Sequence, residues 1–395
     1  MREYTPSAVP GERDGEESFF TGGTPVPRHH EEFGGAVMEF VQTAINTLAD
    51  PKFLLPIALL MLIISLRTPA FWSTKGGLVA LSLILAFFAV SMLNPNFRKI
   101  VTKPDNVPIV MLIFLVGFFV WLAMHQGFEN DRRTEQGLPS KEKEVTNDKV
   151  WVWPDLVYTE FISTVIFGAV MVIWSVFLKA PLEEPANPSL APNPSKAPWY
   201  FLGLQEMLVY YDPWIAGVLL PGLIIVGLMA TPFLDVNPKG NGYFTFKDRK
   251  YEITVFLFGF VILWVLLIIL GTFLRGPNWN FFGPYEYWDP HYLIPLNNVN
   301  LSEFFYVKWL GTGLPSNWFL RELPGIILVI LYLTVTPLVF ARMWFKKFFL
   351  SMGAIRYQIM MFLLLCMFSL PIKMVLRWTF NLKYIVAIPE YFFNI

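Results

Sequence analysis

The chain of 395 residues is 55% hydrophobic and 17% aromatic, and only 15% of it is charged, against about 25% in an ordinary soluble domain. This composition is that of a membrane protein. The 30 basic and 30 acidic residues cancel, so no net field is present to recruit nucleic acid or a polyanionic substrate. We therefore expect lipid and protein partners and no nucleic acid.

The chain is poor in residues that bind redox metals. One cysteine, Cys366, excludes a disulfide framework, a thiolate zinc site, an iron–sulfur cluster and a Cys-x-x-Cys-His haem attachment. The histidines are His29, His30, His125 and His291. The adjacent first pair, in a polar segment, is a weak metal-binding pattern, so we expect no metal site here. Redox metals are therefore expected on other chains.

The N-terminal region divides into a polar and an amphipathic part. Residues 1–35 are rich in Gly, Pro and Glu and lack the features of a cleaved signal peptide, so we expect a flexible or partner-bound polar arm. Residues 36–50 are expected to form an amphipathic helix, which could lie at the membrane surface or dock on a neighbour. Its apolar stripe consists of Val37, Phe40, Val41, Ala44, Ile45 and Leu48.

Eight apolar stretches approach the roughly 20 residues that a helix needs to cross a hydrocarbon core of about 30 Å. They run near residues 52–66, 77–93, 107–125, 156–179, 214–234, 252–274, 324–345 and 355–376. The first two are short, so a tilted hairpin or a partly embedded segment is the alternative for them. The sequence predicts an all-α, polytopic membrane protein with about eight transmembrane helices.

Two long connections, residues 180–213 and 275–323, fall on one side of the membrane and are dense in Pro, Trp, Tyr and Phe. Aromatic side chains with a polar edge favour the headgroup region, so we expect both to fold onto the membrane surface and form a shared functional face. Basic residues such as Lys247 and Lys346 favour a cytoplasmic location for the opposite side. This places the two aromatic connections on the positive side, although residues such as Arg377 then lie outside as well.

Four short strings, taken together in their order and spacing, carry a resemblance to a known family. They are Trp153-Pro154-Asp155-Leu156-Val157-Tyr158, Glu184-Pro185-Ala186-Asn187-Pro188, Ala197-Pro198-Trp199-Tyr200-Phe201 and Thr231-Pro232-Phe233-Leu234-Asp235. The chain thereby resembles subunit IV of the cytochrome bf complex, equivalently the C-terminal half of cytochrome b in bc complexes.

The resemblance divides the chain into five regions. They are the polar arm 1–35, the amphipathic helix 36–50, an additional three-helix membrane region 51–150, a cytochrome b C-terminal, subunit IV-like domain 151–290, and an additional loop with two helices 291–395. The roles of the additional helices cannot be read from the sequence.

The resemblance implies a quinol site. In the family, a quinol bound beside a Pro-Glu-Trp-Tyr-Phe loop is oxidised at the positive face, and two protons leave as electrons pass to an iron–sulfur protein and to haem b. The implied partners are a haem-bearing cytochrome b subunit, a Rieske-type iron–sulfur protein and a c-type cytochrome, in a dimeric complex of a bacterial cytoplasmic (inner) membrane. Haem b, haem c and the iron–sulfur cluster would belong to these partners and none would be covalently bound to this chain.

The residues at the motif position are the expected quinol-binding residues. They are Ala197, Pro198, Trp199, Tyr200 and Phe201. Pro198 replaces the family's glutamate and cannot accept a proton. We expect Glu206, eight residues further on, to be the substitute proton acceptor, with Tyr200 hydrogen-bonding to the quinol or lining its pocket. The alternative is that Glu206 is a water-exposed loop carboxylate.

The sequence thus predicts a haem-free quinol-site subunit of a bc-type quinol:cytochrome c, or similar acceptor, oxidoreductase, active only within its complex. Such a subunit would serve respiratory electron transport coupled to proton translocation. The alternative is a structural or assembly subunit whose quinol site has degenerated, which the missing glutamate supports. A transporter is less favoured, because the spans are nearly free of ionisable residues and no internal repeat is evident.

Overall fold

The structure is a computed structural model that describes residues 29–145, 150–178, 185–237 and 244–395. Most of the predicted polar arm, residues 1–28, and Glu184 of the second motif string lie outside the described residues. The chain separates into a unit that ends at Thr43 and a unit from Ala44 to Ile395. All contacts described below lie within the second unit.

The described residues are mostly helical, which confirms the predicted all-α membrane class. Seven of their helices are long and apolar enough to cross a membrane, or eight if the bent pair of Val37–Ala49 and Pro51–Arg67 is one span. The prediction of about eight spans is therefore confirmed, and the protein is a multi-pass membrane protein. The first predicted span, residues 52–66, becomes long enough to cross the membrane only as part of that pair, whose two helices are bent by 81°.

The N-terminal elements are α1 (His29–Ala49), α2 (Pro51–Arg67), the 3-10 turn η1 (Pro69–Trp72), α3 (Thr74–Ser91), α4 (Pro95–Val101), α5 (Val107–Glu135) and α6 (Lys141–Val145). Asp50 divides α1 from α2, because its side chain accepts a hydrogen bond from the Lys52 amide (2.9 Å) and Pro51 occupies the first turn of α2. Two boundaries differ from the prediction: α1 begins at His29, and α5 continues beyond residue 125 to Glu135.

The middle elements are the π-helical turn η2 (Val152–Leu156), α7 (Val157–Phe177), α8 (Trp199–Met207), η3 (Ile215–Leu219), α9 (Leu220–Leu234), α10 (Lys250–Leu257), η4 (Phe258–Val265), α11 (Leu266–Ile269), η5 (Leu270–Leu274) and η6 (Pro277–Trp279). The elements from α10 to η5 form one span with alternating α-helical and π-helical turns. The sequence did not predict α8, which forms where an irregular connection was expected.

The C-terminal elements are α12 (Leu301–Glu303), η7 (Phe304–Trp309), α13 (Trp318–Met343), α14 (Lys346–Phe380), β1 (Ala387–Ile388), η8 (Pro389–Tyr391) and β2 (Phe393–Asn394). The two short strands pair antiparallel, with Ala387 opposite Asn394. This hairpin is held to α13, because the Ala387 amide donates a hydrogen bond to the buried carboxylate of Glu322 (2.9 Å).

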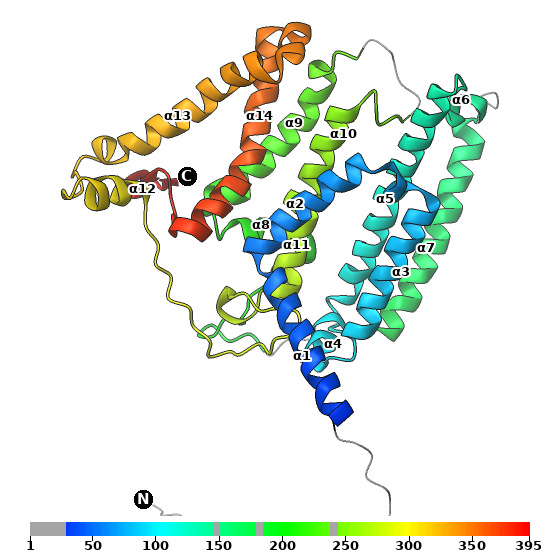
Figure 1. Cartoon of the computed structure of the whole chain (residues 1–395), viewed down its shortest axis with the longest axis horizontal. Helices are drawn as coiled ribbons and strands as arrows, with labels where there is room; N and C mark the ends of the chain where they lie inside the picture. Colours follow the sequence, from blue (N-terminus) through cyan, green and yellow to red (C-terminus); the bar gives the residue numbers. More distant parts are fainter. Residues whose placement is uncertain (1–28, 146–149, 179–184, 238–243) are drawn as a thin grey trace, which may run out of the picture. The chain divides into compact units, whose positions relative to one another are not determined.

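The span Lys250–Leu274 forms the centre of the second unit. In its most apolar stretch of 18 residues, 44% of the residues are buried. In the corresponding stretch of the span Val152–Phe177, none is buried. Its π-helical turns and α11 pack against α8, and α14 packs against both α9 and α13 (Figure 1). α7 has no buried residue, so lipid or another chain must cover its apolar side chains.

The two aromatic connections lie in direct contact on one side of the spans, which we call the motif side. The amide of Asn193 donates a hydrogen bond to the Asn278 side chain (3.0 Å), and the Asn278 main-chain N–H donates to Asn193 Oδ1 (2.6 Å). The C-terminal segment joins the same side, since the Val299 N–H donates to the Asn381 carbonyl (3.2 Å). The expectation that the two connections share one face is confirmed at this contact.

The close packing of α8 on the central span depends on Gly271. A Cβ atom there would lie 3.3 Å from the Leu202 carbonyl oxygen, whereas a Cβ at Gly222 of α9 would meet nothing within 4 Å. We predict that Gly271→Val destabilises the protein by about 1–3 kcal/mol more than Gly222→Val, because only the former overpacks a helix contact. Thermal unfolding of the purified protein in detergent measures both. Equal shifts in the unfolding temperature of the two variants would contradict this role of Gly271.

Candidate functional site

The motif loop runs into α8 and is folded back on it by one glutamine. Pro198 stands directly before the first helical residue, Trp199, where its missing N–H costs no hydrogen bond. From the second turn, Gln205 accepts a hydrogen bond from the Ala197 N–H (2.9 Å) and donates one to the Ser195 carbonyl (2.8 Å). The residues of the Ala197–Phe201 string therefore form one ordered segment at the start of the helix.

α8 has an outer aromatic face and an inner polar residue. Tyr200 and Phe201 are 45% and 47% exposed, and their ring centroids are 4.4 Å apart. Trp199 adjoins them, with its ring centroid 5.4 Å from that of Tyr200. Glu206 is fully buried, so the structure does not bring the two predicted catalytic residues, Tyr200 and Glu206, onto the same face.

Glu206 is held by an arginine and is not the water-exposed carboxylate of the alternative interpretation. The Arg275 side chain donates from Nη2 to Glu206 Oε1 (2.6 Å) and from Nε to Oε2 (3.0 Å). Arg275 also donates to the Trp279 carbonyl (3.0 Å), and the Tyr210 hydroxyl lies 3.5 Å from Glu206 Oε1. Such a bidentate pair is geometrically specific. These contacts engage both carboxylate oxygens.

The pair is electrostatically coupled to its buried surroundings. Burial opposes the charge of Arg275, but Glu206 beside it outweighs this effect and raises the pKa of Arg275. Burial, with the charge of Glu206, raises the pKa of Tyr210. Arg275 therefore stays charged and Tyr210 stays protonated, so both groups serve Glu206 as hydrogen-bond donors.

Two charged residues of this site were missed by the sequence interpretation. Lys196 stands two positions before Pro198, and its ammonium group donates a hydrogen bond to the Thr272 carbonyl (2.7 Å) and lies 4.7 Å from the centre of the Trp288 ring. Arg275, the other, is the first residue after the sixth span. Lys196 stands in the motif loop and Arg275 at the end of a span. A charged residue in such a place usually has a charge partner or a function, so these positions were the signals that the sequence offered.

Among the described residues, no group of three or more His, Cys, Asp or Glu side chains could hold a metal ion, and the side chains of His29 and His30 lie outside this description. His125 Nδ1 lies 2.7 Å from the Trp72 carbonyl, and its ring stacks on Trp121. It therefore joins α5 to η1.

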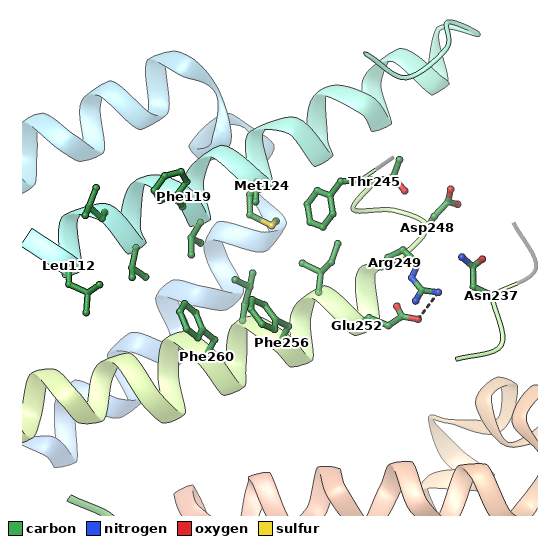
Figure 2. Close-up of a pocket in the computed structure, with 17 residues that line it drawn as sticks. Leu112, Phe119, Met124, Asn237, Thr245, Asp248, Arg249, Glu252, Phe256 and Phe260 are labelled. Carbon is green, nitrogen blue, oxygen red and sulfur yellow. Dashed lines mark ion pairs between the residues drawn. The ribbon is translucent and has the colours of Figure 1, made fainter. Parts of the chain in front are cut away.

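A pocket of about 840 Å³ lies between α5 and α10, away from the motif loop (Figure 2). Its walls are apolar and include Leu112, Phe119, Met124, Phe256 and Phe260. Its polar end belongs to the connection before α10, where Arg249 pairs with Glu252 (3.4 Å) and with Asp235 (2.8 Å). This connection lies on the side opposite the motif side, so the pocket is a separate feature.

Removing one member of the Glu206–Arg275 pair should lower the free energy of unfolding more than removing both members. Arg275→Gln leaves a buried carboxylate without its charge partner, so we predict a loss of about 3–5 kcal/mol in the free energy of unfolding. The double variant Glu206→Gln/Arg275→Gln should recover a large part of that loss. Arg249→Gln, at the more exposed pair, is the control, with an expected loss of about 0–1 kcal/mol. Denaturant unfolding measures these differences, and additive losses would contradict the coupling.

Comparison with known proteins bears on the segment that builds this site. Residues 185–285 match the family model described as cytochrome b (C-terminal)/b6/petD, and no solved structure matches the chain. The match contains the motif loop, α8, the fifth and sixth spans and Arg275. Residues 151–184, which carry the first motif string, lie outside it.

The match confirms the resemblance that the motif strings indicated, and this family points to a component of a bc-type redox complex. Within this multi-pass membrane protein, residues 185–285 are therefore similar to the C-terminal part of cytochrome b and to b6/petD.

Proposed function

We propose that the protein is the haem-free subunit that lines the quinol-oxidation pocket of a bc-type quinol:cytochrome c, or similar acceptor, oxidoreductase. The observation that carries the proposal is the exposed pair Tyr200 and Phe201 at the start of α8, inside the segment that matches the family. A quinol ring requires an apolar slot with a few well-placed polar groups. The rings of Trp199 and Phe201 would line that slot, and the Tyr200 hydroxyl would bind a quinol oxygen.

The exposed aromatic face implies that another chain completes the pocket. We assign that chain to a haem-bearing cytochrome b subunit, and electron acceptance to a Rieske-type iron–sulfur protein and a c-type cytochrome. The proposed complex is dimeric and lies in a bacterial cytoplasmic membrane. Lys247 and Arg249 lie in the connection before α10, and Lys346 and Lys347 begin α14, all opposite the motif side. Their positive charges support a motif side at the positive face.

Glu206 is the proposed proton acceptor in this pocket. It is fully buried next to the motif segment, and quinol oxidation releases protons that a group in the pocket must accept. In the structure both carboxylate oxygens are engaged by Arg275. A quinol proton would therefore reach Glu206 either at a lone pair that Arg275 leaves unused or after this ion pair opens.

The first test concerns the aromatic wall. In the complex purified through this subunit, Phe201→Ala should lower kcat/KM for quinol oxidation about tenfold, since a buried phenyl ring contributes about 1.5–3 kcal/mol. Phe233→Ala, an exposed aromatic at the far end of α9, is the matched control and should leave the rate unchanged. A native complex without quinol oxidation, or equal rates for both variants, would contradict the proposal.

The second test separates a chemical role of Glu206 from a structural one. If Glu206 accepts a proton, Glu206→Gln and the double variant Glu206→Gln/Arg275→Gln should both slow quinol oxidation by about 100-fold or more. If Glu206 only balances the charge of Arg275, the double variant should regain activity together with stability. Quinol oxidation rates of assembled complexes, normalised to their haem content, distinguish the two results.

The second candidate function is a structural or assembly subunit with a degenerate quinol site. Pro198 at the family's glutamate position favours it, as does the engagement of Glu206 by Arg275, which stabilises the contact of α8 with the central span. This function predicts that the aromatic variants change complex yield and leave the turnover of assembled complexes unchanged.

A further inference from the structure

Lys196 is a cation beside the motif loop that the proposed mechanism does not use. Its side chain is half-buried, and within the described part of the chain no ion pair joins it to a carboxylate. It is held instead by the Thr272 carbonyl at 2.7 Å and by the face of the Trp288 ring at 4.7 Å. A lysine without a carboxylate partner in partly dry surroundings is a recurring arrangement for proton transfer.

The two residues that hold Lys196 also carry unsatisfied polar atoms. The Thr272 hydroxyl and the Trp288 indole nitrogen are buried, and among the described residues neither has a hydrogen-bond partner. Thr272 is 1% exposed. A buried polar atom without a partner is costly unless a bound molecule satisfies it. The Thr272 hydroxyl and the Trp288 indole N–H belong to the two residues that contact the Lys196 amine. A ligand oxygen that can both donate and accept, as a quinol hydroxyl does, would satisfy such groups.

We propose that Lys196 accepts a proton from the quinol hydroxyl at the motif loop. It would take the role of the family's glutamate, whose position is occupied here by Pro198, which cannot accept a proton. The inference rests on the proposed quinol site. It adds a second proton-accepting group beside Glu206, and the oxidation of a quinol releases two protons. Lys196 lies two residues before the vacated glutamate position, whereas Glu206 lies eight residues beyond it and is engaged by Arg275.

The proton and the electron have separate destinations. The lone pair of the neutral Lys196 amine takes H⁺ from the quinol O–H, which leaves an ammonium ion and a quinol anion. The anion then loses an electron to a one-electron acceptor of the iron–sulfur class on a partner chain. The ammonium returns its proton to water on the motif side, and the amine is neutral again.

Burial, together with the charges around Lys196, keeps its amine able to exchange protons near neutral pH. Burial lowers the pKa of Lys196 to about 7, with further lowering by Lys103 and Arg275 and partial opposition from Glu206. The amine must be neutral to accept a proton. The rate of quinol oxidation should therefore rise as the pH rises through about 7 and fall below it.

The test uses the native complex with a synthetic benzoquinol, across pH values on both sides of neutrality. Lys196→Met should lower kcat by about 100-fold or more and abolish the acidic limb of the pH profile, with little change in KM. Lys196→Arg, which keeps the charge and the donor to Thr272, should also be slow because it cannot give up its proton. Lys196→His should restore part of the rate, because imidazole can again accept a proton.

Lys308→Met is the matched control, because this exposed lysine lies in the other aromatic connection on the same side. It should keep the wild-type rate and pH profile. Wild-type turnover with an unchanged acidic limb in both Lys196→Met and Lys196→Arg would overturn the role of Lys196 and leave the quinol site intact. Absence of quinol oxidation in the wild-type complex would instead overturn the proposed function itself.

Discussion

The bidentate ion pair between Glu206 and Arg275 is the contact on which the candidate site depends. It joins α8, which carries the motif, to the first residue after Lys250–Leu274, the most buried of the described spans. Because both charges are withdrawn from water, neither can be removed alone without leaving the other uncompensated. The pair thereby fixes the inner face of α8 and leaves Tyr200 and Phe201 on the outer face.

The asymmetry of α8 explains how a chain with so few metal-binding residues can contribute to redox chemistry. Its inner face is committed to packing and charge balance, and its outer face is aromatic and uncovered. The outer face meets the requirement for one wall of an apolar slot, which a partner chain would close. Lys196 stands directly before the motif string, and its ammonium group contacts the Thr272 carbonyl and the Trp288 ring.

The sequence predicted the fold class, the spans and the family segment because long apolar runs and the order of several motif strings are local signals. It did not predict α8, since Pro and aromatic residues are typical of irregular surface connections as well as of helix starts. Nor did it predict that Arg275 pairs with Glu206, because the two residues are 69 positions apart and only the packing of α8 on η5 brings them together. The same packing separates Tyr200 from Glu206, which the family resemblance had placed in one quinol site.

The most direct measurement of the central claim is photoaffinity labelling of the native complex with an azido-quinol, followed by mapping of the labelled peptide. If this chain lines a quinol pocket, the label will be found within residues 197–201 and will be displaced by excess quinol. Displaceable labelling that occurs only in the α5–α10 pocket, or only on partner chains, would contradict the assignment of the motif segment to the quinol site.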